Sequence, residues 1–177
     1  MAGLLDDIRV LDWTQWQTGT VASAMLADLG AEVIHIENRL TGDGGRGLNQ
    51  LFWAVPEGRN SYFECNNRGK KGIAIELTKD NGKEVIYRLV KKSDAFVHNY
   101  RQGVPERLKL EYETLRQHNP RLIYAAVSGY GPKGPEAREP VSSNPLVSID
   151  FDSGGRTHPA TDLAGITSLR PGELSHI

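Results

Sequence analysis

Basic side chains recur where apolar segments of this 177-residue chain give way to polar loops. They are Arg39, Arg46, Arg68, Lys70, Lys71, Lys79, Arg101 and Arg107. Guanidinium and ammonium groups bind phosphate through charge-assisted hydrogen bonds, so a convergent set would favour a phosphorylated ligand. For each residue alone, a solvated surface position is the simpler interpretation. As a set at the ends of expected strands, they indicate an anionic small-molecule site.

Carboxylates could supply an acid, a base or a nucleophile, but none stands out from the residues alone. Asp12 and Glu37 lie at the ends of apolar segments. Three more aspartates, Asp150, Asp152 and Asp162, lie in the last part of the chain.

Several other kinds of site are disfavoured. His35 and His98 lie inside apolar segments, where a packed or edge histidine is the expected role. Ser128, in VSGYG, is not a GxSxG nucleophile elbow. The loop TQWQTG at residues 14–19 has neither GxGxxG nor GxxxxGK[ST], which argues against NAD or ATP. Cys65 is the only cysteine, so no internal disulfide and no cysteine–zinc cluster are expected.

The elements that must position these side chains begin with the segment from Ile8 to Glu37. It predicts a strand at 8–13, a helix at 20–29 that stops at Gly30, and a strand at 33–36. This βαβ unit implies parallel pairing and a right-handed crossover. Ligands of such sheets lie beyond the carboxyl ends of the strands, which places residues 14–18 and 37–39 at one rim.

The same alternation continues along the chain and predicts an open, mostly parallel α/β sheet flanked by helices. The later strands are expected at 72–77, 94–99 and 121–127, and the helices at about 80–92, capped by Thr78 or Asp80, at 102–108 and at 112–118. We expect an α/β domain over residues 1–140, truncated after the fifth strand, and a weakly specified tail over residues 141–177. Pro171 would end any helix in that tail.

Composition disfavours two classes of partner, nucleic acids and membranes. A net charge of −1 with 24% charged residues gives no strong field for nucleic acid or an anionic membrane. No run of eighteen apolar residues and no secretory leader occur, so a cytoplasmic protein without a membrane span is expected.

Five segments resemble the class III CoA-transferases, the CaiB/BaiF family, and they occur in that family's order. They are IRVLDWT at 8–14, MLADLGAEVIHIE at 25–37, NNRGKKGIAIEL at 66–77, residues 81–108 (NGKEVIYRLVKKSDAFVHNYRQGVPERL) and NPRLIYAAVSGYGPKGP at 119–135. The resemblance implies a Rossmann-like large domain and interlocked homodimers. It also implies an enzyme that moves CoA between an acyl-CoA thioester and a small carboxylic acid through an aspartyl covalent intermediate. CoA and acyl-CoA would be substrates, with no permanently bound cofactor and no metal. Racemisation of 2-methylacyl-CoA esters is the alternative chemistry on the same scaffold.

The resemblance also implies site residues, position by position. Gln17 matches an active-site loop residue whose amide could donate to a carbonyl or anhydride oxygen. Contacts to CoA are implied for Asn38 or its neighbour Arg39, Leu77, Lys79, Asn99, Tyr100 and Arg107. Asn38 stands where the family usually has an arginine, and Arg39 follows it.

The nucleophile is implied by ATDLAG at residues 160–165, which resembles the family's Ala-Asp-x-x-Gly motif and assigns the role to Asp162. Asp152, in Asp-Ser-Gly-Gly, is a second candidate. Two family stretches that normally precede the nucleophile are absent after Pro140. The chain is less than half the family's usual length, so the family's interlocked dimer is not expected to close. A truncated remnant that binds CoA without turnover is therefore the alternative hypothesis, and the acyl group is left open.

Overall fold

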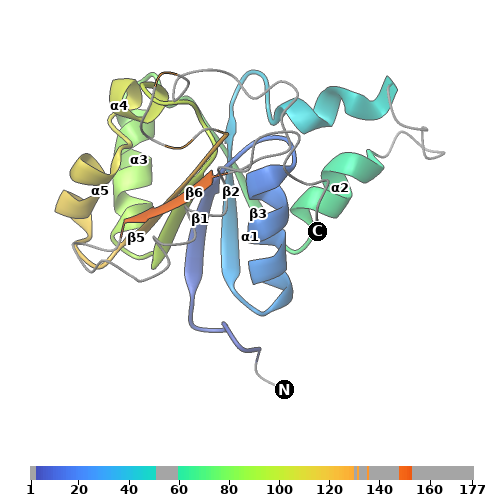
Figure 1. Ribbon diagram of the computed structural model, residues 1–177, viewed down its shortest axis with the longest axis horizontal. Coiled ribbons are helices and arrows are strands. Elements are labelled where there is room, and N and C mark those ends of the chain that lie inside the picture. The colour runs from blue at the N-terminus through green and yellow to red at the C-terminus, as the bar shows by residue number, and fades with distance from the viewer. Residues whose placement is uncertain (1–2, 51–59, 130, 132–134, 136–147, 153–177) are drawn as a thin grey trace, which may run out of the picture.

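A six-stranded sheet forms the centre of the computed structural model, which describes residues 3–50, 60–129, 131, 135 and 148–152 (Figure 1). The strands are β1 (Arg9–Trp13), β2 (Glu32–Asn38), β3 (Lys71–Ile75), β4 (Ala95–His98), β5 (Ile123–Ser128) and β6 (Ser148–Asp152). Their order is β3-β2-β1-β4-β5-β6, and all pairings are parallel except that of β5 with β6. The expected open, mostly parallel α/β sheet is confirmed.

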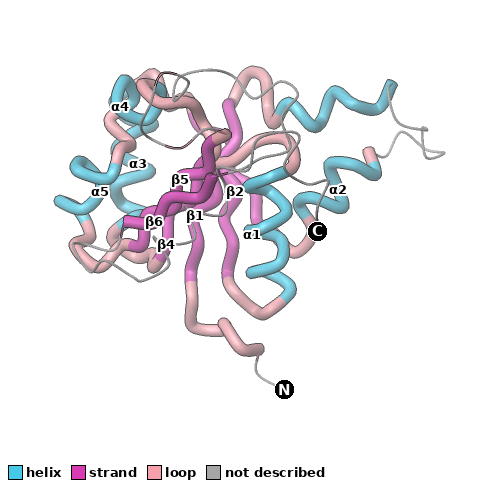
Figure 2. Tube along the Cα trace, viewed as in Figure 1, coloured by secondary structure: helices cyan, strands magenta, loops and turns pink. Residues whose placement is uncertain are grey.

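Helices cover both faces of this sheet, as Figures 1 and 2 show. They are α1 (Thr18–Asp28), the 3₁₀ helix η1 (Gly44–Gln50), α2 (Ser61–Asn67), α3 (Asp80–Val90), α4 (Val104–Leu108) and α5 (Tyr112–His118). Helices α1 and α2 lie together on one side, and α3, α4 and α5 on the other.

Alternation along β1 assigns its side chains to the two faces. Leu11 and Trp13 belong to the larger buried cluster, which includes Ile86 of α3. Val10 belongs to a smaller cluster under α1. Asp12 shares the face of Val10 and is fully buried. The strand therefore carries a carboxylate into the layer between the sheet and α1.

Gly30 ends α1 as expected, with a φ of +105° that side chains rarely adopt. The predicted cap of α3 is wrong: Lys79 is the capping residue and makes no capping side-chain bond. Thr78 instead donates to Glu76 Oε1 at 2.6 Å, and Asp80 accepts from Lys83 Nζ at 3.0 Å. Neither side chain turns back to the helix start, so the expected capping bond is not made.

Three elements were not expected from the sequence, namely η1, α2 and β6. Helix α2 starts at Asn60, whose side chain accepts a hydrogen bond from the Phe63 amide at 3.0 Å and so caps it. Strand β6 adds an antiparallel edge inside the segment expected to be a tail, with Asp152 paired with Tyr124 in the register.

Candidate functional site

The site lies at the carboxyl edge of the sheet, where the strand order reverses between β1 and β4. Crevices at such points bind ligands in open α/β sheets. Here Asn99, after β4, clamps the loop after β1. Its Oδ1 accepts from the Gln15 amide at 2.9 Å, and its Nδ2 donates to the Gln15 carbonyl at 2.7 Å. Tyr100 stacks on Trp13 with ring centroids 4.1 Å apart, and its hydroxyl bonds to the Gln15 side chain. The two loops are therefore held as one unit.

The clamped loop continues through a left-handed turn at Trp16, whose φ is +67°. Its amide donates to Asp43 Oδ1 at 3.3 Å, and its carbonyl accepts from Thr20 Oγ1 at 2.5 Å. The indole lies against Gly44, where an added Cβ would be 2.6 Å from the ring, and is 49% exposed. Gln17 follows as the exposed capping residue of α1, and its side chain makes no capping bond. The turn thus presents an indole and an amide at the rim.

Beneath this loop lies a buried ionic cluster around Asp12. The register of β1 and β2 places Asp12 opposite His35. Its Oδ1 accepts from Thr14 Oγ1 at 2.5 Å, and its Oδ2 accepts from Ser23 Oγ at 2.7 Å and Lys70 Nζ at 2.8 Å. His35 Nδ1 lies 3.0 Å from the same Oδ2. Every side chain bonded to this carboxylate therefore comes from a different part of the fold.

Lys70, immediately before β3, is also satisfied on all sides. Besides Asp12, its ammonium donates to the Thr20 carbonyl at 2.8 Å and to Asn67 Oδ1 at 2.9 Å. Burial lowers the pKa of Lys70, and the charge of Asp12 offsets this only in part. Burial would raise the pKa of Asp12, but hydrogen bonding to His35 and the charge of Lys70 hold it below its usual value. The cluster is thus ionised and balanced.

His35 carries a positive charge between two carboxylates. Its Nε2 lies 3.4 Å from Asp43 Oδ2, on the opposite side from Asp12. Burial by itself lowers the pKa of His35, but the hydrogen bond to Asp12 and the nearby Asp43 carboxylate raise it to about 9. His98 lies in the contrasting environment: burial lowers its pKa to about 4, and its Nδ1 accepts from the Tyr100 amide at 3.2 Å. Both histidines are packed as the sequence indicates, but only His35 is ionised at neutral pH.

The expected ligand residues gather at this same rim. Asn38 ends β2 and accepts from the Leu40 and Thr41 amides at 2.8 and 3.2 Å, so its side chain shapes a turn. Arg39 is exposed beside it. Leu77 is buried, and Lys79 is exposed at the start of α3. Arg107 is exposed on α4, and Asn99 and Tyr100 form the clamp described above. Asp162 lies outside the described residues, as does the side chain of Asp152.

The basic set divides in two. Four of its members are neutralised internally: Arg46 by Glu37, Arg68 by Asp28, Lys70 by Asp12 and Lys71 by Glu32. Lys71 also begins β3, at the opposite edge from the rim. The other four, Arg39, Lys79, Arg101 and Arg107, are exposed and make no ion pair with the residues that the structure describes. Four of the eight cations therefore remain for an anionic ligand.

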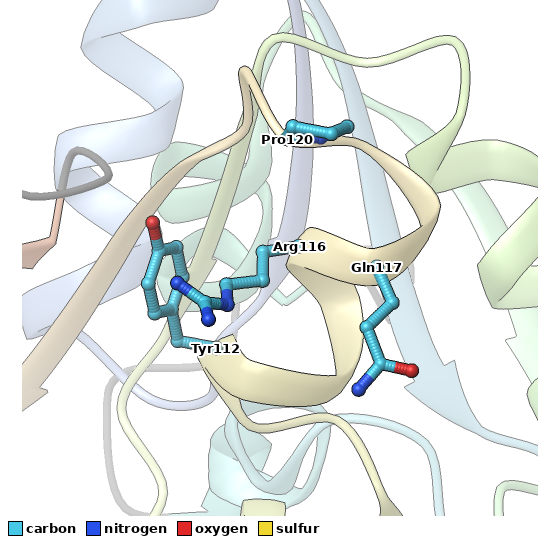
Figure 3. Close-up of a pocket in the computed structure, with 4 residues that line it drawn as sticks. All are labelled: Tyr112, Arg116, Gln117 and Pro120. Atoms are coloured by element: carbon cyan, nitrogen blue, oxygen red, sulfur yellow. The ribbon is translucent and has the colours of Figure 1, made fainter.

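A surface hollow of about 320 Å³ lies away from the rim, on α5 (Figure 3). It is lined by Tyr112, Arg116, Gln117 and Pro120. Arg116 pairs with Glu113 at 2.9 Å and lies over the Tyr112 ring at 5.8 Å. None of the expected site residues lines it.

The described part of the chain offers neither a metal site nor a membrane span. No group of three or more histidine, cysteine, aspartate or glutamate side chains could hold a metal there. Its helices are all too short or too polar to cross a membrane.

Comparison with known proteins gives consistent matches over the sheet domain. "Probable fatty acyl-CoA transferase Rv3272" of Mycobacterium tuberculosis is 41% identical over 139 residues, covering 77% of this chain and 34% of that protein. Succinyl-CoA:mesaconate CoA-transferase of Haloarcula hispanica is 41% identical over 131 residues, covering 73% and 33%. A CAIB/BAIF family protein from Brucella suis superposes with a TM-score of 0.72 and 34% identity, covering 78% of this chain and 37% of that one.

The chain therefore spans about a third of the length of the relatives it matches. The family model named CoA-transferase family III matches residues 5–144, which include every element from β1 to β5. This chain belongs to CoA-transferase family III.

Proposed function

We propose that this chain provides the CoA-binding part of an enzyme that moves CoA between an acyl-CoA thioester and a carboxylic acid. The observation that carries the proposal is the rim itself. Gln17 and the exposed cations Arg39, Lys79 and Arg107 follow different strands, yet they lie at one edge of the sheet. CoA carries several phosphates, and exposed cations at strand ends suit them. The named transferase relatives support the same chemistry.

The proposed reaction begins with attack of the Asp162 carboxylate on the thioester carbonyl. The C–S bond breaks, CoA leaves as a thiolate, and an aspartyl–acyl anhydride forms. The thiolate then attacks the aspartyl carbonyl, which releases the first carboxylic acid and leaves an aspartyl-CoA thioester. The acceptor carboxylate repeats both steps in reverse order, and Asp162 is regenerated. The Gln17 amide would donate to the oxyanion of each addition.

Lys79→Ala is expected to weaken binding of CoA, because Lys79 is a rim cation without an ion-pair partner in the described part of the chain. We expect a loss of about tenfold in affinity by calorimetry, decreasing as salt is raised. The matched control is Lys91→Ala. Lys91 is also exposed, and it lies at the other end of the same helix, away from the carboxyl ends of the strands. Equal losses in both variants would show that CoA responds to overall charge and not to this rim.

Covalent chemistry is tested by intact-protein mass spectrometry of the full chain after incubation with succinyl-CoA or acetyl-CoA. A mass gain that hydroxylamine removes, and that is absent in Asp162→Asn, supports the transferase proposal. A mass gain that persists in Asp162→Asn would mean that another residue is the nucleophile, and Asp152→Asn would be the next variant to test.

A second candidate function is binding of CoA without turnover, which needs only the exposed cations of the rim. A CoA-binding domain without turnover would give no adduct but would keep the calorimetric signal and its dependence on Lys79. Loss of both signals would overturn both functions.

A further inference from the structure

The loop at Trp16 holds a conformation that a tryptophan does not adopt by preference. A φ of +67° at a residue with a side chain is disfavoured, and such positions persist only where the surroundings determine them. Three contacts do so here. The Trp16 amide donates to Asp43 Oδ1, its carbonyl accepts from Thr20, and its ring packs on Gly44.

Asp43 is the link between this turn and the buried cluster. Its side chain is 1% exposed, and its Oδ1 accepts from both the Trp16 and the Gly45 amides. Its Oδ2 faces His35 Nε2 at 3.4 Å and has no hydrogen-bond partner in the described residues. A buried carboxylate needs a neighbouring cation, and His35 occupies that position. One oxygen of Asp43 therefore faces His35 while the other accepts from the Trp16 amide.

We propose that His35 is a positioning residue that acts through Asp43 to hold Trp16 in its left-handed turn, and so presents the Trp16 indole and the Gln17 amide to the ligand at the rim. The positioning role of His35 does not depend on the proposed function, but the identity of the ligand as CoA does. The loop and the buried cluster would form one unit in which the charge of His35 sets the shape of the rim.

Other charged groups around His35 must be separated from it in any pH experiment. Asp12 faces it from β1, Asp43 from the segment after β2, and Lys70 from the residue before β3. Glu37, paired with Arg46, follows His35 on β2. Burial and the charge of Asp43 raise the pKa of Tyr62 of α2. The centroid of the Phe63 ring of α2 is 6.4 Å from that of the His35 imidazole. A variant of His35 itself is therefore the needed reference.

The test follows Trp16 directly by fluorine NMR. The full chain contains three tryptophans and is produced with fluorinated tryptophan, and Trp16→Phe assigns the resonance. We expect the Trp16 resonance to shift as pH rises, with a midpoint near the pKa of His35, about 9. In His35→Gln this titration is absent, and the resonance lies at its high-pH position already at neutral pH. Ser23→Ala, which removes a donor to Asp12 but leaves Asp43 untouched, keeps the titration.

The affinity for acetyl-CoA tests whether the position of Trp16 matters for ligand binding. We expect the wild type to lose affinity above pH 9, and we expect His35→Gln to bind about fivefold more weakly at neutral pH and to lack this pH dependence. A Trp16 resonance that does not titrate in the folded wild type, or that titrates equally in His35→Gln, overturns the proposal. If His35→Gln does not fold, Asp43→Asn replaces it, because removing the Asp43 carboxylate breaks the same link to Trp16 and should abolish the titration. If the wild type binds no acetyl-CoA, the proposed function fails, and the fluorine titration still decides the role of His35.

Discussion

Asp12→Asn is expected to lower the free energy of unfolding by about 3–5 kcal/mol, the loss typical when one member of a buried ion pair is removed. The asparagine side chain has nearly the same shape, so packing against Ser23 and Thr14 is preserved. What is lost is the negative charge that both His35 and Lys70 face at 3.0 and 2.8 Å. Both cations would remain buried without their shared counter-ion. Urea unfolding of the two proteins at neutral pH measures the difference.

The matched control for this prediction is Asp28→Asn. Asp28 also pairs with a cation, Arg68, but its side chain is 47% exposed, whereas that of Asp12 is fully buried. Water solvates the remaining charge at the exposed site, so the control should change stability little. Similar midpoints for the two variants would contradict the view that the buried cluster is held by charge. A further variant, Asp12→Asn with Lys70→Met, should recover part of the loss, because it removes one unpaired cation.

The sequence predicts the sheet well because its signals are local. The helix expected at 112–118 matches α5 in full, and the five expected parallel strands are all present. Helix α2 was missed because its sequence, SYFECNN, lacks an apolar period and depends on the Asn60 cap. Strand β6 was missed because its pairing with β5 is a long-range contact that no local pattern encodes.

The contacts of the buried cluster around Asp12 could not be predicted either, because they are also long-range. Asp12 inside the apolar run IRVLDW was a visible signal, since a carboxylate in a buried strand needs a partner. The candidates His35 and Lys70 are 23 and 58 residues away, and only the register and the turn before β3 bring them together. Lys70 was therefore grouped with the cations of the rim. Asn99 was expected to contact CoA, and its role as a clamp on Gln15 depends on the adjacency of β1 and β4.

The stability of the chain is expected to fall as pH rises toward 10, because the cluster holds a protonated histidine. The pKa of His35 is about 9 in the folded chain and 6.5 as the ordinary value. The folded state therefore binds a proton that the unfolded state has released between these two values. The stabilisation is complete below pH 6.5 and is lost as pH rises through 9. This difference in the pKa of His35 corresponds to about 3 kcal/mol of folding free energy.

Urea unfolding across this pH range measures the effect, and His35→Gln isolates it. The variant has lower stability at pH 6.5 and a flatter profile, so the two curves should converge as pH passes 9. Lys70 acts in the opposite direction, because its lowered pKa makes the folded state release its proton more readily at high pH. The charge of Lys70 also acts on His35, so this contribution differs between the two proteins, and Lys70→Met measured with and without His35→Gln separates the two effects. Parallel curves would mean that His35 is neutral in the fold. The pairing with Asp43, and the positioning of Trp16 that depends on it, would then lose their physical basis.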